Sequence, residues 1–147
     1  MTEATPSRRG EYPHFLRIPT RWIDNDVYGH INNVVYYAYF DTVVNEHLIQ
    51  SGLDIRGGPA IGLVVETMCR FHRPLSFPVT VDAGLRVMRL GTSSVRYAIG
   101  VFAVGEDDAA ATGHFVHVWV DRAGRRPTPV RAPHRTRGAQ AARSSRC

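Results

Sequence analysis

The sequence contains no lysine, little cysteine and no long apolar segment. All 18 basic residues are arginine, and one of the two cysteines, Cys147, is the last residue. This pair provides neither a disulfide framework nor the spacing of a zinc site. Cys69 stands inside an apolar run, so we expect it to be a small buried hydrophobe rather than a nucleophile. No stretch approaches the roughly 20 apolar residues that a membrane-spanning helix needs.

The first 15 residues also lack the apolar core of a secretory signal, so we expect a cytoplasmic protein. A length of 147 residues suits a single domain. Hydrophobic residues make up 44% of the chain, which is too many for a disordered protein. These features predict a soluble globular domain.

Acidic residues are absent from the last part of the chain. Residues 122–147 contain eight arginines and no acid, which leaves residues 1–121 with ten arginines and thirteen acids, a net charge of −3. The net charge of +5 therefore belongs to the tail. Such a tail could be solvated or could bind an anionic partner. We expect a solvated tail and no binding of nucleic acid. We predict a flexible N-terminus (1–13), a domain (14–133) and an Arg-rich flexible tail (134–147).

Hydrophobic patterning predicts one strand, one helix and then four strands. The first strand is expected over 14–23, and the others over the segments 60–73, 79–90, 93–104 and 110–121. The short turns between the last four favour antiparallel neighbours. The helix is expected over 33–51, capped by Asn32 or Asn33 and ended by Gly52. Its first half, VVYYAYF, is apolar all round and must be enclosed. These elements predict an α+β domain, with an antiparallel five-stranded sheet wrapped around one long central helix.

The segment DNDVYGHINN (24–33) stands directly before this helix. Asp24, Asp26 and Asn32 could be only turn and capping residues. However, the first backbone N–H groups of a helix are unpaired and carry partial positive charge, which suits a developing oxyanion. The carboxylates, Gly29 and His30 beside an enclosed helix therefore favour a functional site.

A strand, the pattern D-x-D-x-x-G-H-x-N-N, an aromatic-rich helix and a four-strand meander resemble the hotdog-fold thioesterases, in the branch typified by 4-hydroxybenzoyl-CoA thioesterase. The resemblance spans roughly residues 14–121 and is most specific over 24–39. It implies an acyl-CoA thioester hydrolase that releases free CoA and a carboxylic acid, with no cofactor beyond the CoA of its substrate. It also implies sites between subunits of a homodimer, often assembled into a tetramer.

The resemblance assigns the chemistry to Asp26, acting as nucleophile or as general base, and places the thioester carbonyl at the amide of Asn33. His30 is a further catalytic candidate, and a structural role is equally open for it. The substrate-binding candidates are Asp24, Gly29, Asn32, Tyr36 and Glu66, although Asp24 could instead hold the loop and Tyr36 could be plain core. The CoA-binding candidates are Arg89, Thr92, Ser93, Ser94 and Arg96, with Arg70 and Arg73 behind them.

A metal site is a further option because Asp24, Asp26 and His30 offer ligand atoms, as do His114 and His117. The last two are three positions apart in a strand and therefore face opposite sides, so they cannot chelate one ion together. We predict no metal. Two other functions stay open: a hotdog hydratase or dehydratase, which would pair His30 with Asp26, and a non-catalytic acyl-CoA-binding module.

Overall fold

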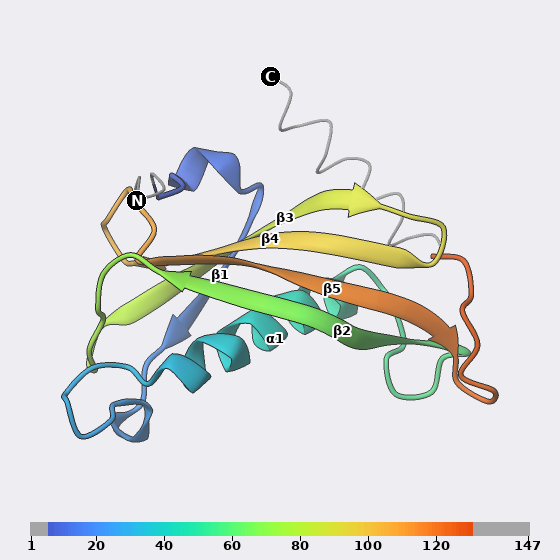
Figure 1. Cartoon of the computed structure of the whole chain (residues 1–147), viewed down its shortest axis with the longest axis horizontal. Helices are drawn as coiled ribbons and strands as arrows, with labels where there is room; N and C mark the ends of the chain where they lie inside the picture. The colour runs from blue at the N-terminus through green and yellow to red at the C-terminus, as the bar shows by residue number, and fades with distance from the viewer. Residues whose placement is uncertain (1–5, 131–147) are drawn as a thin grey trace.

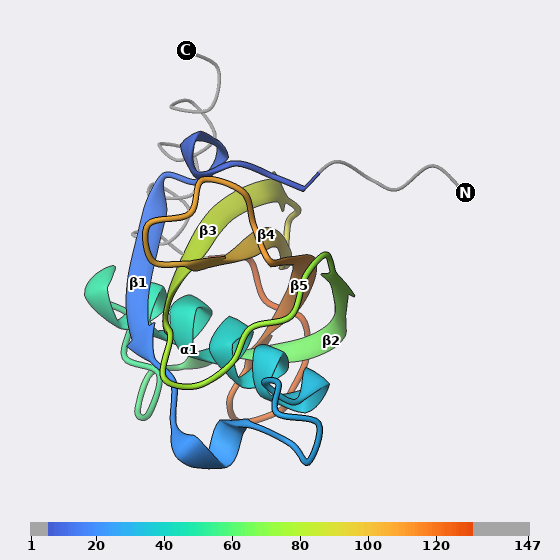
Figure 2. The same cartoon turned by 90° about the vertical axis from the view of Figure 1, so that its left-hand side faces the viewer.

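The computed structural model describes residues 6–130, which form one sheet and one long helix. The strands are β1 (His14–Pro19), β2 (Ala60–Phe71), β3 (Thr80–Leu90), β4 (Ser94–Ala103) and β5 (Ala111–Asp121), and the helix is α1 (Asn33–Gln50). The sheet is antiparallel throughout, in the order β1-β3-β4-β5-β2, and it curves around α1 (Figures 1 and 2). The predicted α+β hotdog architecture is confirmed.

Helix α1 begins and ends at the residues that its caps dictate. The Asn32 side chain accepts a hydrogen bond from the N–H of Val34 at 3.1 Å, and Gly52, just beyond the helix, has a φ of +89°. One side of the helix packs on the inner face of the sheet through its most buried apolar residues, Tyr36, Tyr39, Phe40, Val43, Val44 and Leu48. Gly113 on β5 allows this approach, because a Cβ there would stand 2.7 Å from the Phe40 ring.

The prediction that the first half of α1 is enclosed is wrong for a single chain. Val34 is 71% exposed, and Ile49 near the other end is 56% exposed. A single curved sheet covers only one side of a helix, so the opposite side of α1 faces outward (Figure 2). Within residues 6–130, no helix has the length and apolar character that crossing a membrane requires.

The first strand is shorter than predicted and ends at Pro19 rather than at residue 23. Proline has no N–H with which to continue a ladder, and the hydroxyl of Thr20 donates instead to the carbonyl of Val79. The chain then forms a short 3₁₀ helix, η2 (Trp22–Asp24), that leads into the DNDVYGHINN loop. The loop is thus anchored by structure on both sides, η2 before it and α1 after it.

Residues 8–12, within the segment 1–13 that the sequence predicts to be flexible, pack on the outer face of the sheet. They form the 3₁₀ helix η1 (Arg9–Glu11), and Tyr12 is only 6% exposed. Gly84 and Gly100, paired across β3 and β4, leave a bare patch that Tyr12 covers: a Cβ on either would come within 2.8 Å of its ring. The predicted tail, 134–147, lies outside the described residues.

Candidate active site

The loop before α1 is tied down by Asp24, which is 1% exposed. Its carboxylate accepts hydrogen bonds from the N–H of Arg21 at 2.9 Å, from Arg21 Nε at 3.0 Å and from the Tyr39 hydroxyl at 3.0 Å. Its backbone carbonyl accepts from the N–H of Asn32 at 2.9 Å. Asp24 therefore connects η2, the loop and α1. This position supports the loop-holding role that the sequence left open, rather than contact with a substrate.

Asp24 is expected to make stability depend on acidity. Burial alone would raise the pKa of its carboxyl, but the hydrogen bonds from Arg21 and Tyr39 outweigh burial and lower the pKa. Because the pKa of Asp24 is lower in the folded than in the unfolded state, its ionised carboxylate stabilises the fold at pH values above the ordinary pKa of about 4. This stabilisation is lost as the pH falls through the folded-state pKa.

The variant Asp24→Asn should therefore lower the free energy of unfolding at pH 7 by about 2 kcal/mol, the scale of hydrogen bonds to a buried charge. Chemical denaturation of both proteins between pH 7 and pH 3 should show this difference shrinking below about pH 4. Asp107→Asn, at a residue whose side chain is 77% exposed, is the matched control. A difference that stays constant with pH would contradict the assignment.

Asp26 is held in a tight turn that orients its carboxylate. Its N–H donates to the His30 carbonyl at 2.9 Å, and its own carbonyl accepts from the N–H of Gly29 at 3.0 Å. Gly29 has a φ of +82°, a conformation that other residues rarely adopt. One carboxylate oxygen of Asp26, Oδ1, accepts from the N–H of Tyr28 at 2.9 Å. Within residues 6–130 the other oxygen has no recorded hydrogen bond, so it is available to a ligand.

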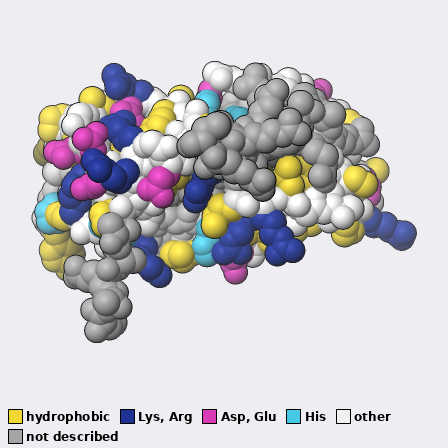
Figure 3. All heavy atoms as spheres, turned by 90° about the horizontal axis from the view of Figure 1, so that it is seen from above, with side chains coloured by type: hydrophobic (Ala, Val, Ile, Leu, Met, Phe, Trp, Pro, Cys, Tyr) yellow, Lys and Arg dark blue, Asp and Glu magenta, His cyan; other side chains and the backbone are white. Residues whose placement is uncertain are grey.

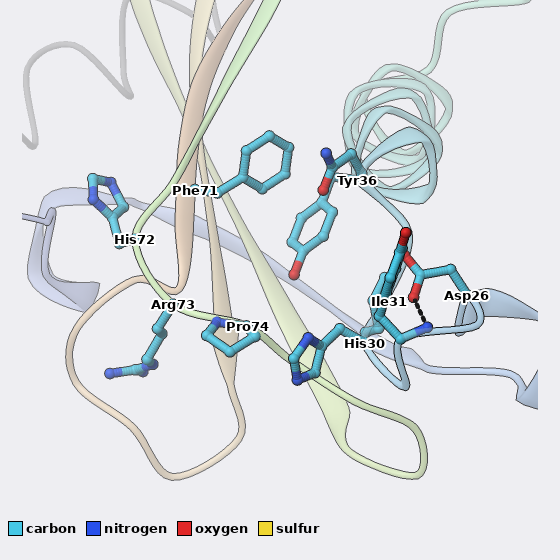
Figure 4. A pocket seen from close by; sticks show the side chains of 10 residues that line it. Asp26, His30, Ile31, Tyr36, Phe71, His72, Arg73 and Pro74 are labelled. Atoms are coloured by element: carbon cyan, nitrogen blue, oxygen red, sulfur yellow. Dashed lines mark hydrogen bonds between the residues drawn. The ribbon is translucent and has the colours of Figure 1, made fainter.

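Asp26 lines a pocket of about 530 Å³ between the start of α1 and the end of β2. The predicted residues His30, Asn33 and Tyr36 line the same pocket. The opposite wall consists of Phe71, the last residue of β2, and the three residues that follow it, as Figure 4 shows. The structure thus brings together four predicted residues, which come from the loop and from the first turn of α1.

Asn33 is the first residue of α1, so its N–H has no partner within the helix. Within the described part of the chain no acceptor is recorded for this N–H, and Asn33 is exposed on the pocket wall. The positive end of the helix dipole adds to the attraction of this position for a negative oxygen. The pocket therefore contains a carboxylate and a free backbone donor.

Tyr36 supplies a buried hydroxyl to this pocket. The residue is 2% exposed, and burial raises the pKa of its phenol to about 12, so it stays protonated at neutral pH. Its ring packs edge-to-face on Phe71, with ring centroids 5.0 Å apart. Figure 4 shows the Tyr36 side chain pointing from α1 into the space beside His30. Tyr36 is thus both core and pocket wall.

The sequence did not single out the wall formed by Phe71, His72 and Pro74. Arg73, also in this wall, was named only as a secondary CoA candidate. His72 Nε2 lies 2.8 Å from the Thr112 hydroxyl of β5, and Arg73 donates to the Asp108 carbonyl at 2.8 Å. The sequence signal for this wall is a run of aromatic and basic residues at the end of a predicted strand. Its position opposite the start of α1 depends on the sheet order, which the sequence alone does not specify.

Three other substrate candidates lie outside this pocket. Asn32 caps α1, and Gly29 lines a neighbouring cavity of about 420 Å³ on the other side of Asp26. Glu66 was expected to meet a polar partner. It stands on the outer face of the sheet, where its carboxylate lies 2.9 Å from His114 Nε2 and 3.7 Å from Arg96. Figure 3, which views the molecule from above Figure 1, shows basic, acidic and histidine side chains close together on this side.

The predicted CoA-binding residues lie at the opposite end of the sheet from Asp26. Four of them, Arg89, Thr92, Ser93 and Ser94, stand at or beside the turn between β3 and β4. Arg96 pairs with Val116, which pairs with Glu66, five residues before Phe71 and therefore roughly 17 Å from it along β2. The structure does not bring these five residues to the Asp26 pocket of their own chain.

The two histidines of β5 lie on opposite faces of the sheet, as the alternation of side chains along a strand predicts. His114 meets Glu66 on the outer face, whereas His117 is 3% exposed among aromatic rings on the inner face. Among residues 6–130, no group of three or more His, Cys, Asp or Glu side chains is placed to hold a metal ion.

Comparisons with known proteins agree with this geometry. Residues 19–137 match the family model of the thioesterase-like superfamily. No curated protein matches the chain. The solved PA5185 protein from Pseudomonas aeruginosa strain PAO1 is 50% identical, with a TM-score of 0.90 over 92% of this chain and 96% of that one. The PA2801 protein of Pseudomonas aeruginosa, a proposed thioesterase, is 34% identical, with a TM-score of 0.79 over 88% and 99%.

A third solved structure is a thioesterase from Thermus thermophilus in complex with coenzyme A and zinc. It is 28% identical, with a TM-score of 0.76 over 93% of this chain and 97% of that one. Together the fold and the family match define the class: this is a hotdog-fold thioesterase. The chain belongs to the thioesterase-like superfamily.

Proposed function

We propose that this enzyme hydrolyses an acyl-CoA thioester at Asp26 and releases free CoA and a carboxylic acid. One observation above all supports the proposal: the carboxylate of Asp26 and the unpaired N–H of Asn33 line the same pocket. A carboxylate that attacks or activates water, together with a backbone donor for the oxyanion, is sufficient for thioester hydrolysis because thiolate is a good leaving group.

In the proposed reaction the thioester carbonyl oxygen accepts a hydrogen bond from the N–H of Asn33. As nucleophile, Asp26 adds to the carbonyl carbon, the C–S bond breaks and CoA leaves as thiolate. Water then cleaves the resulting mixed anhydride and regenerates the carboxylate. As general base, Asp26 instead takes a proton from the water that adds to the carbon, and that proton passes to the departing thiolate. The Tyr36 hydroxyl and His30 line the space beside the reacting atoms.

The test is a panel of acyl-CoA substrates in which free thiol is measured over time. Release of thiol with catalytic turnover is the expected result, and failure on every substrate would refute the proposal. An enoyl-CoA included in the panel addresses the hydratase alternative, which keeps some support because His30 and Asp26 share the pocket. Loss of the conjugated double bond without thiol release would favour that alternative.

We also propose that the enzyme is a homodimer in which a second copy covers β2 and the open side of α1. β2 is an edge strand, and apolar side chains such as Val65 (61% exposed) and Met68 (36% exposed) lie on it. Unpaired edges with apolar side chains are templates for association. In such a dimer the CoA candidates at the β3–β4 turn would serve the partner's pocket rather than their own.

The double substitution Val65→Lys and Met68→Lys should convert the dimer to a single chain, since burying two charges in an apolar interface is costly. Sedimentation equilibrium should give twice the mass of one chain for the wild type and the mass of one chain for the variant. Val104→Lys, at a residue 41% exposed beyond β4, is the matched control and should stay dimeric. A monomeric wild type, or an unchanged double variant, would refute this interface.

A further inference from the structure

A second, smaller cavity lies at the other end of α1 from the Asp26 pocket. It has a volume of about 150 Å³ and opens between the last turns of α1, the start of β2 and the end of β5, at the right-hand end of Figure 1. Asn33 and Asn45, which line the two cavities, are twelve positions apart on the helix, or about 18 Å. The two cavities of one chain are therefore separate sites.

The lining of this cavity combines apolar and polar residues. Leu48, Ile61 and the Trp119 ring stand beside Asn45 and His117, and Leu48 and Trp119 are 1% and 4% exposed. At the volume of liquid water, about 30 Å³ per molecule, the space would hold about five waters, each of which needs two to four polar partners. A cavity of this volume is also large enough for a benzene ring.

His117 is a buried polar residue in this wall. It is 3% exposed, and its Nδ1 has no hydrogen-bond partner within the described part of the chain. Gly62 makes room for the ring, because a Cβ at that position would stand 3.0 Å from Nδ1. Burial lowers the pKa of His117 to about 4, so the imidazole is neutral at pH 7. A buried ring nitrogen without a partner is costly and calls for an explanation.

The neutral ring restricts which group would pair with this nitrogen. Nδ1 either donates or accepts, depending on the tautomer, and a hydroxyl can serve both. Nearby, the Asn45 amide donates through Nδ2 to the Asp41 carbonyl at 2.8 Å, which leaves its oxygen as an additional acceptor. A ring of benzene size with one hydroxyl thus matches the cavity in volume, polarity and hydrogen bonding.

We propose that the cavity around His117 is a binding site for a phenol-sized ring, with the ring hydroxyl hydrogen-bonded to the His117 imidazole. The site is distinct from the Asp26 pocket of the same chain. None of the described residues that line the cavity carries a charge at pH 7, so the proposal selects neutral phenols over phenolates and carboxylates.

The test is titration of the full-length protein with phenol and with benzene, followed by backbone amide NMR. Phenol should bind saturably and about tenfold more tightly than benzene, the fold-change that one hydrogen bond provides. The amides of Asn45 and Gly62 should shift, whereas those of Gly29 and Asn33 should not. The absence of saturable phenol binding, or shifts confined to Gly29 and Asn33, would overturn the proposal.

Two variants separate the hydrogen bond from the cavity. His117→Phe keeps an aromatic ring without nitrogen and should bind phenol and benzene equally, and a retained tenfold preference would refute the role of His117. Ala60→Leu places three further carbons in the cavity and should abolish binding of both ligands. Ala123→Leu, in the exposed turn after β5 and outside the cavity lining, is its matched control and should bind as the wild type does. Binding that survives Ala60→Leu would place the ligand elsewhere.

Discussion

Replacing Asp26 with asparagine should lower kcat for acyl-CoA hydrolysis by about 10²–10⁴, the range that a positioned acid or base contributes. The amide of asparagine has nearly the same shape and can still accept from the N–H of Tyr28, so the loop should keep its conformation. It is neither a nucleophile nor a base, however, and the chemical step should fail while KM changes little. Steady-state kinetics with a thiol-detecting reagent measures both constants.

Asp107→Asn is the matched control, because the Asp107 carboxylate is 77% exposed and does not line the pocket. It should leave kcat within a few-fold of the wild type. An Asp26→Asn variant with full activity would remove Asp26 from the mechanism while leaving the thioesterase class intact.

A single-turnover reaction with a substrate labelled in the acyl group separates the two roles of Asp26. Label that stays on the denatured wild-type protein, and is absent from Asp26→Asn, identifies the mixed anhydride. Label that never appears on the protein, although product forms, favours the general base.

Replacing Asn33 with proline should lower kcat by about 10²–10³, the cost of losing one oxyanion donor. Proline removes the backbone N–H together with the asparagine side chain, and it is well tolerated at the first position of a helix. The preceding residue, Asn32, already has φ −62° and ψ 139°, the extended conformation that residues before proline favour. The substitution should therefore delete the proposed donor without disturbing α1.

Asn33→Ala is the matched control, because it removes the side chain and keeps the N–H. It should retain most of the activity. If both variants lose activity equally, the side chain rather than the amide is responsible. If both stay fully active, the oxyanion lies elsewhere. Circular dichroism and thermal unfolding of both proteins confirm that α1 is intact.

Much of the site is local in sequence and was therefore predictable. Asp24, Asp26, Gly29, His30 and Asn33 lie within ten residues, so a turn and a helix cap suffice to place them. The helix caps at Asn32 and Gly52 are likewise decided by short-range hydrogen bonding and by backbone freedom. The alternation of apolar residues located the strands to within a few positions, except where Pro19 ended β1 early.

The far wall of the pocket and the position of Tyr12 depend on which distant segments of the chain become neighbours, so only the tertiary structure decided them. The strand order β1-β3-β4-β5-β2 places Phe71 and His72, at the end of β2, opposite the start of α1. Tyr12 is ordered because Gly84 and Gly100 meet across two strands, and no local pattern reveals that pairing. The sequence by itself determined the conformation of each segment and the chemistry of the loop, because both arise from neighbouring residues. Only long-range packing built the far wall of the pocket and left one side of α1 open.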